Sequence, residues 1–148
     1  MITAIVGFIW VVIHNLHVFR SRPKDSLGEI KKVTTLAGLN VEPENLPSDL
    51  LSEARKKWEK GQYQEALSLL YRGSISSLVT RQLVEIEESD TEMDCLRRVI
   101  SRGEIASASY FALLTNAWIS QAYARRCPNE EIIDELWKEW PFQEGGSQ

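Results

Sequence analysis

Residues 58–79, WEKGQYQEALSLLYRGSISSLV, decide the fold of this chain. Large apolar residues recur at helical spacing around a glycine, which predicts a helix that ends at Gly61 and a second helix over about 62–81. Three interpretations are open from these letters alone. The stretch is half of a helical repeat that binds a peptide, the lining of an active site, or a core helix and its turn.

The helical periodicity continues over residues 48–142, and no strand alternation there supports a sheet. We therefore expect an all-α fold in which a small bundle of about five helices forms one modest core. Ser48 is the expected N-cap of the first helix, and either Ser89 or Asp90 that of the third. Pro128 is expected in the first turn of the fifth helix. The helices are expected over about 48–60, 62–81, 90–101, 104–125 and 128–140, followed by a polar tail at 143–148.

The apolar side of each expected helix predicts which side chains fill the core. Aromatic residues are numerous for so small a domain, and we expect most of them to pack inside. A groove in which one or two aromatic residues contact a partner helix or peptide is the open alternative. The expected inward residues are Tyr63, Ala66, Leu67, Leu70, Ile75, Leu78, Val79, Met93, Leu96, Val99, Ile100, Tyr110, Phe111, Leu114, Ala117, Trp118, Tyr123, Ile132, Ile133, Leu136, Trp137 and Trp140. The opposite side of the second helix carries Gln64, Glu65, Ser68, Arg72 and Ser76.

Composition and charge limit the classes of function. Of 148 residues, 43% are hydrophobic and 26% are charged, which is ordinary for one globular domain with accessory segments. The formal net charge is −4, so the chain lacks the basic surface that nucleic-acid binding requires, and nucleic acid is not an expected partner. Cys95 and Cys127 have no paired spacing, which argues against a disulfide framework or a zinc site and suits a reducing compartment.

The first twenty residues predict a membrane anchor. Residues 2–19, ITAIVGFIWVVIHNLHVF, contain no permanently charged side chain, and as a helix they reach roughly 27 Å, close to the thickness of a hydrocarbon core. The charged start and small-residue cleavage site of a signal peptide are both missing. We expect a retained single transmembrane helix within residues 1–20, with a cleaved or interfacial segment as the alternative.

The residues that flank this segment predict its orientation. Arg20, Arg22 and Lys24 follow it, and no lysine or arginine precedes it. The positive-inside rule therefore predicts a single-pass protein of the inner (cytoplasmic) membrane whose C-terminal domain lies in the cytoplasm. His14 and His17 share a helix face, where we expect interfacial polar residues, and a metal or haem ligand pair is the alternative.

Residues 21–47 are expected to form a linker. They mix charges with two glycines and three prolines, and their apolar residues are too sparse for a core face. Leu27 to Leu39 has the pattern of a short amphipathic helix on the membrane surface. Because the stretch from Pro43 to Pro47 stops a helix on either side, we place the domain boundary there, before a helical domain over 48–142.

The helical domain lacks the residues that many catalytic mechanisms need. Both histidines of the chain lie in the membrane segment, which removes Ser-His, Cys-His and imidazole-metal mechanisms from the domain. The glycines are isolated, so no phosphate-binding loop is expected. The acidic pairs at 87–88 and 130–131 are adjacent in sequence and diverge on a helix. We therefore expect no catalytic residues, no metal and no cofactor in the domain.

The opening stretch resembles a tetratricopeptide repeat. Trp58, Gly61, Tyr63 and Ala66 follow nearly the rhythm of such a repeat, with one residue too few between the glycine and the tyrosine. A second copy is expected about 34 residues later, where the chain reads EMDCLRRVIS from residue 92 without a Trp, Gly or Tyr in register. A lone repeat-like domain that binds a peptide is kept as an alternative.

A wider set of positions follows the pattern of another family: Ala54, Gly61, Tyr63, Ala66, Leu67, Leu70, Tyr71, Arg72, Leu78, Thr91, Leu96, Tyr123, Arg125, Pro128, Glu131 and Leu136. With these positions, residues 53–142 resemble the C-terminal domain of TgpA-like bacterial membrane proteins, a small helical domain of unknown function. The chain departs from that pattern at Ala124, where Gly is usual. It departs again at Asp94 and Cys95, where a Glu-aromatic pair is usual.

The resemblance implies a cytoplasmic domain that follows the last membrane span of a bacterial protein. In many relatives a periplasmic transglutaminase-like domain precedes that span, and genes nearby encode MoxR-type ATPases. The chain contains no transglutaminase-like domain, so that activity is not carried over. The family pattern also supplies no catalytic residues.

These patterns together predict a membrane-anchored cytoplasmic protein-interaction module without catalytic activity of its own. One alternative is a regulatory accessory subunit of a transglutaminase-like or MoxR-type ATPase system, and another is a one-span subunit that binds a cofactor through His14 and His17. The bilayer is the expected partner of residues 2–19, and a protein is the expected partner of the domain. The candidate partner-binding residues are Tyr71, Arg72, Arg97, Arg98, Arg125 and Arg126, and a solvated basic face explains the arginines equally well.

Overall fold

The computed structural model describes residues 34–142 except 37, 82 and 103–104. Two compact units make up the chain, 1–31 and 32–148, and the described residues belong to the second. The transmembrane helix and the polar tail predicted at the two ends lie outside the described residues. Within these residues, no helix has both the length and the apolar character that a membrane crossing requires.

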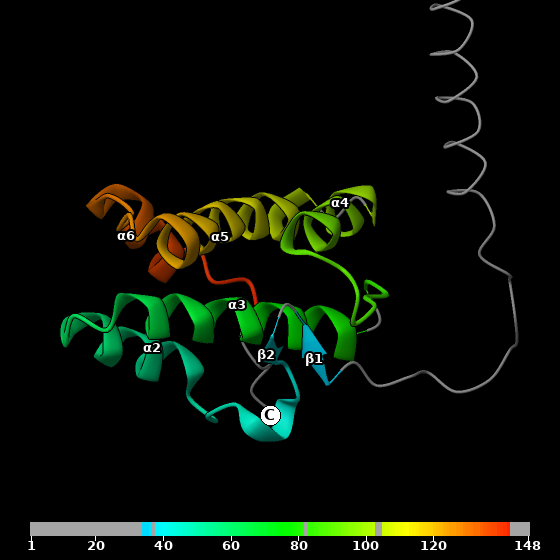
Figure 1. Cartoon of the computed structure of the whole chain (residues 1–148), viewed down its shortest axis with the longest axis horizontal. Coiled ribbons are helices and arrows are strands. Elements are labelled where there is room, and N and C mark those ends of the chain that lie inside the picture. Colours follow the sequence, from blue (N-terminus) through cyan, green and yellow to red (C-terminus); the bar gives the residue numbers. More distant parts are fainter. Residues whose placement is uncertain (1–33, 37, 82, 103–104, 143–148) are drawn as a thin grey trace, which may run out of the picture. The chain divides into compact units, whose positions relative to one another are not determined.

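Five α-helices form a small bundle, which confirms the helical part of the predicted fold. They are α2 (Leu50–Glu59), α3 (Tyr63–Thr80), α4 (Glu92–Arg102), α5 (Ile105–Ala124) and α6 (Glu130–Lys138). Figure 1 shows α2 and α3 in one layer and α4, α5 and α6 in a second layer. The two layers meet where α3 contacts α5.

A small β-hairpin precedes the helices. β1 (Thr35–Leu36) pairs with β2 (Leu39–Asn40) in antiparallel register, and Gly38 in the turn has a positive φ of 78°. A glycine at positive φ favours a tight hairpin turn, which is why Thr35, Leu36 and Leu39 lie in strands and not in the amphipathic helix expected up to Leu39.

The hairpin is part of the packed domain. Leu36 is fully buried, Val41 is nearly so, and β2 contacts α3. A single 3-10 turn, η1 (Pro43–Asn45), leads from the hairpin toward α2. The described end of the segment expected to be a linker is therefore held against the helices.

The N-caps of α2 and α6 differ from the predicted ones. The Asp49 carboxylate, and not Ser48, caps α2 by accepting a hydrogen bond from the Ser52 backbone N–H at 3.2 Å. Asn129 caps α6 in the same way, so Pro128 lies before the helix rather than in its first turn. In both places a carboxylate or amide oxygen reaches the free backbone N–H three residues later, which a cap one residue earlier does not reach.

Helix α4 begins with a reciprocal cap that excludes the predicted caps, Ser89 and Asp90. The Asp94 backbone N–H donates to Thr91 Oγ1 at 3.3 Å, while the Thr91 backbone N–H donates to the Asp94 carboxylate at 3.0 Å. This is the arrangement of a capping box. Asp90 instead accepts a hydrogen bond from the Glu87 backbone N–H at 2.8 Å and so closes the loop before the helix.

The turn between α2 and α3 confirms that Gly61 ends the first helix. Gly61 has a φ of 77°, and its N–H donates to the Trp58 carbonyl at 2.9 Å. The Gln62 N–H donates to the Lys57 carbonyl at 2.9 Å. These two bonds form a Schellman motif, whose left-handed residue is favoured as glycine because a Cβ would strain it.

The core lies between α3 and α5, and this position explains which expected inward residues are exposed. Helix α3 is covered by α2, α5 and the hairpin, so even Ser74 and Ser76 of this helix are buried. Met93 and Ile100 are 47% and 55% exposed, because α5 covers only one side of α4. Tyr63 and Tyr123, which were also expected inside, lie at the first turn of α3 and the last turn of α5 and are exposed.

Candidate functional site

The six candidate partner-binding residues are spread over three elements. Arg97 pairs with Asp94 one turn earlier on α4 at 2.7 Å, and both side chains reach solvent. Arg98 pairs with Asp90 at 3.0 Å and with Glu87 at 3.4 Å, which ties α4 to the preceding loop. An exposed pair such as Arg97 with Asp94 contributes little to stability.

Arg125 and Arg126 follow the end of α5, and both are exposed. Arg125 has a φ of 50°, which is the left-handed conformation common at helix ends, and its N–H donates to the Gln121 carbonyl at 3.2 Å. The Arg126 N–H donates to the Ser120 carbonyl at 3.0 Å. The backbone of this pair terminates α5, and its side chains are available to solvent.

Tyr71 lies in the core, which corrects the expectation that it contributes to a partner-binding surface. Its ring stacks on Phe111 with 5.5 Å between centroids and on Trp118 with 6.1 Å, both from α5. The Tyr71 hydroxyl has no hydrogen-bond partner in the described chain other than the Cys95 thiol beside it, which is a weak one. Burial raises the pKa of this hydroxyl well above its ordinary value, so it is uncharged at any physiological pH.

Arg72 points away from the core and toward the hairpin. Its Nε donates to the Asn40 carbonyl, and its Nη2 donates to the Asn45 carbonyl at 3.4 Å. In the part of the chain that the structure describes, no carboxylate lies within ion-pair distance of its guanidinium. Partial burial lowers the pKa of Arg72 from its ordinary value, yet an arginine remains cationic at neutral pH.

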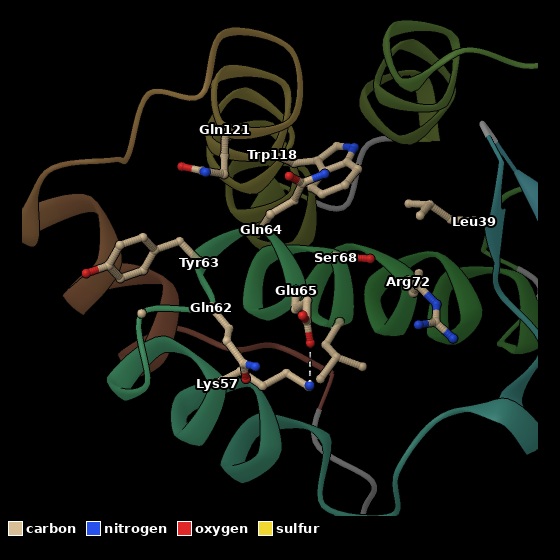
Figure 2. A pocket seen from close by; sticks show the side chains of 12 residues that line it. Leu39, Lys57, Gln62, Tyr63, Gln64, Glu65, Ser68, Arg72, Trp118 and Gln121 are labelled. Atoms are coloured by element: carbon tan, nitrogen blue, oxygen red, sulfur yellow. Dashed lines mark hydrogen bonds and ion pairs between the residues drawn. The ribbon is translucent and has the colours of Figure 1, made fainter.

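A hollow of about 590 Å³ lies along α3, and Arg72 is the one candidate residue among those that line it. Figure 2 shows Arg72 and Leu39 at one end of the hollow and Tyr63 and Gln121 toward the other. The floor is α3, and the walls come from α2, α5 and β2. The lining residues are Leu39, Lys57, Gly61, Gln62, Tyr63, Gln64, Glu65, Ser68, Leu69, Arg72, Trp118 and Gln121.

The charges in the hollow do not cancel. Lys57 of α2 forms an ion pair with Glu65 of α3 at 2.6 Å, as the dashed line in Figure 2 marks. Among the described residues the partners of Arg72 are neutral carbonyls, so the described lining carries one uncompensated positive charge. The remaining polar lining consists of the hydroxyls of Tyr63 and Ser68 and three glutamine amides, which can both donate and accept hydrogen bonds, and of the Trp118 indole N–H, which only donates.

An aromatic cluster holds the Tyr63 end of the hollow in place. The ring of Trp58 lies 4.5 Å from that of Tyr63 and 6.3 Å from that of Trp137 in α6. The Arg55 guanidinium lies over the Trp137 ring at 5.6 Å, within the range of a cation–π contact. Tyr63 therefore presents one part of its ring to solvent while its other contacts restrict its motion.

Three polar side-chain atoms of α5 have no hydrogen-bond partner in the described chain. They are Trp118 Nε1, Gln121 Oε1 and the Thr115 hydroxyl, which recur every three residues along the helix. Trp118 is 5% exposed, and both Trp118 and Gln121 line the hollow. A buried polar group without a partner costs about 1–3 kcal/mol, so water or a bound molecule that supplied the missing bonds would be stabilised here.

A second group of titratable side chains lies where α4 meets α5. Tyr123 Oη donates to Glu92 Oε1 at 2.9 Å, and the Cys95 thiol lies beside Tyr71. Burial raises the pKa of Cys95 to about 12, which keeps it a thiol rather than a nucleophilic thiolate. Over the described residues, no three His, Cys, Asp or Glu side chains are arranged to hold a metal ion.

The sequence offered one signal for the hollow. The predicted polar side of the second helix contains Gln64, Glu65, Ser68 and Arg72, which form its floor. The wall residues Trp118 and Gln121 come from a helix about fifty residues later, and the hairpin wall comes from the expected linker. Their place in the hollow depends on packing that no local pattern encodes.

Comparison with known proteins adds no relative, because the chain matches no family model, no curated protein and no solved structure. The resemblance to the C-terminal domain of TgpA-like membrane proteins stays a prediction.

Proposed function

We propose that this protein is a membrane-anchored protein-interaction module that binds its partner in the hollow along α3 and has no catalytic activity of its own. The observation that carries the proposal is an open hollow with an uncompensated cation at one end and a restrained, exposed tyrosine at the other. Sites that recognise proteins commonly combine aromatic residues and arginine with adaptable amides.

The helical hairpin formed by α2 and α3 supports the alternative of a lone repeat-like domain that binds a peptide. A three-residue turn joins these two antiparallel helices, and α4 and α5 also contact each other as successive helices. Helix pairs stacked in this way commonly form peptide-binding surfaces. Both this alternative and the proposal above place the partner in the hollow. In the alternative the partner is a short peptide, and in the proposal it is a larger protein.

The anchor rests on the apolar residues 2–19 and the positive charges that follow them. An anchor that holds a small binding domain at a membrane raises the effective concentration of a partner at the same surface. A partner that is a transglutaminase-like protein or a MoxR-type ATPase would support the accessory-subunit alternative.

Photo-crosslinking in intact cells tests the proposal on the full chain. A benzoylphenylalanine placed at Gln64, in the hollow, is expected to give a discrete adduct with another protein after irradiation. The matched control places the same residue at Asn116, an exposed position of α5 that does not line the hollow. An adduct pattern at Gln64 that equals the pattern at Asn116, or no adduct at either, would overturn the proposal.

A further inference from the structure

The guanidinium of Arg72 is held by two hydrogen bonds and, among the described residues, has further N–H groups free to bind a ligand. Of its five N–H groups, one on Nε donates to the Asn40 carbonyl and one on Nη2 to the Asn45 carbonyl. These two bonds hold the side chain across the hairpin and the 3-10 turn. The N–H groups that remain on Nη1 and Nη2 are the pair that binds a carboxylate in the bidentate arrangement.

A carboxylate is the ligand group whose charge this end of the hollow lacks. Glu65, the acidic residue of the lining, already pairs with Lys57 at 2.6 Å. Arg72 is half-buried, so an ion pair formed there is less screened by water and salt than one at an open surface. The neutral carbonyls of Asn40 and Asn45 orient the arginine and leave its charge uncompensated.

The rest of the hollow has the length and chemistry of an extended peptide. From Tyr63 to Arg72, α3 rises roughly 14 Å, which equals about four residues of extended chain. Gln62, Gln64 and Gln121 offer amide donors and acceptors toward the Tyr63 end of this path, as Figure 2 shows, and the side chain of Gln121 has an oxygen without a partner in the described chain. The volume of about 590 Å³ falls in the usual range for a bound small ligand or a few residues.

We infer that the partner enters this hollow as an extended acidic segment, with an Asp or Glu carboxylate bound to Arg72 and its main chain bound to the glutamine amides. The inference rests on the proposed function and names the chemistry of the partner. An apolar residue of the segment next to the acid would contact Leu39, which lies at the Arg72 end of the hollow.

A peptide-retention experiment with the full chain in detergent micelles tests this chemistry. One probe is a library of capped hexapeptides with a single Asp or Glu among uncharged residues, and the second is the matched library with Asn or Gln in its place. The wild-type chain is expected to retain the acidic library about tenfold or more over the amide library, in line with a charge-assisted hydrogen-bonded pair. Equal retention of the two libraries, or retention of neither, would overturn the inference.

A variant that keeps Arg72 in place makes the test specific. Ser68→Glu puts a carboxylate one turn before Arg72 on the same face of α3, where it pairs with the arginine and repels an acidic ligand. It is expected to abolish the acidic preference while circular dichroism shows an unchanged helical content. Asn116→Glu makes the same charge change on α5 outside the hollow and is expected to retain the preference. Loss of binding in both variants, or in neither, would contradict an Arg72 site.

Two further measurements show whether the hollow is occupied by a second copy of the chain or by the chain's own C-terminal tail. A Gln64 crosslink at twice the mass of the chain identifies a second copy as the occupant, and acidic peptides that bind only a variant ending at Phe142 identify the chain's own tail; either result overturns the inference. A heterologous Gln64 adduct without any acidic preference overturns the inference but leaves the proposed function standing. No adduct at all removes the proposed function itself.

Discussion

Arg72 and Tyr71 are neighbours in sequence and have opposite environments. Tyr71 stacks on two α5 rings in the core, and Arg72 extends across the surface to two carbonyl groups of the segment before α2. A step of one residue turns the side chain by about 100° around a helix, so adjacent residues face different partners. Adjacent candidate residues therefore need not share a surface, and the position of each side chain has to be determined separately.

The two cysteines are expected to react at very different rates. Cys95 is fully buried and its pKa is raised to about 12, whereas Cys127 is exposed after α5. In the native full chain a dithionitrobenzoate assay should modify Cys127 alone, and in denaturant it should modify both. Cys127→Ser is the control and should remove the native reaction. Equal rates for the two thiols in the native state would contradict the buried position of Cys95.

The carboxylate of Asp94 is expected to stabilise the protein in a pH-dependent way. Hydrogen bonds from the Thr91 hydroxyl and backbone N–H, with a smaller effect of Arg97, hold the pKa of Asp94 below its ordinary value of 3.8. A lowered folded-state pKa means that the stabilisation is complete above that ordinary value and is lost as the pH falls through the lowered value.

Urea unfolding of the wild type and of Asp94→Ala measures this dependence. The difference in unfolding free energy should be constant from neutral pH to about pH 5 and should shrink as the carboxylate becomes protonated below about pH 4. Asp134→Ala, an exposed carboxylate on α6, is the control and should show a small difference without this decline. A difference for Asp94→Ala that stays the same in acid would exclude the capping role of the charge.

At the scale of elements, α2 and α3 approach closely at one glycine. A Cβ on Gly73 would lie 2.5 Å from Leu50 Cδ1, so the absence of a side chain at Gly73 makes room for the Leu50 side chain. Gly73→Leu should therefore destabilise the protein by about 1–3 kcal/mol through overpacking. Leu50→Ala alone should cost about 2 kcal/mol or more, because it leaves a space between the two helices.

A double-mutant cycle shows whether these two residues share one space. The new leucine of Gly73→Leu can occupy the space that Leu50→Ala leaves, so the double variant should lose less stability than the sum of the single variants, by about 0.5–3 kcal/mol. Leu51 points to another side of α2, so Leu51→Ala is the control. Its effect on the unfolding free energy should add to that of Gly73→Leu without coupling. Thermal or urea unfolding measures each term, and strict additivity for the first pair would contradict the close approach.

At the scale of the whole molecule, the anchor predicted at residues 2–19 is expected to hold the chain in the membrane during a carbonate wash. Ile9→Arg with Val12→Arg adds two charges within the apolar run, each of which costs about 2.5–3.5 kcal/mol near the centre of a span, and should release the protein. Ser21→Arg with Ser26→Arg adds the same charge after the run and should leave it in the membrane. Release of the unmodified chain would refute the anchor.

The exposed thiol of Cys127 provides a measure of orientation. If the domain lies in the cytoplasm, a membrane-impermeant maleimide should label Cys127 only after the cells are permeabilised. The Cys127→Ser variant controls for labelling elsewhere. Labelling in intact cells would place the domain on the outer side and reverse the predicted topology.

Much of the helical architecture could be predicted because its determinants are local. The glycine turn at Gly61, the apolar periodicity of α3 and the polar caps depend on groups within a few residues of each other. The caps predicted at Ser48 and at Ser89 or Asp90 were still misplaced by one or two residues, since several polar residues at each helix start are chemically able to cap. Local sequence limits the cap to a few polar residues, and the backbone geometry of the folded chain decides which of them caps the helix.

Local sequence was enough to predict a short series of helices between residues 50 and 138 with a glycine turn at Gly61, because hydrogen bonds and steric limits within one turn of backbone do not depend on distant contacts. Tertiary packing places β2 against α3, leaves Met93 and Ile100 exposed, and leaves Arg72 without a carboxylate partner among the described residues. The hollow combines residues 39, 57, 68 and 118 from four elements. Their proximity arises from burial of the shared core, which is a property of the whole packed domain and of no single segment.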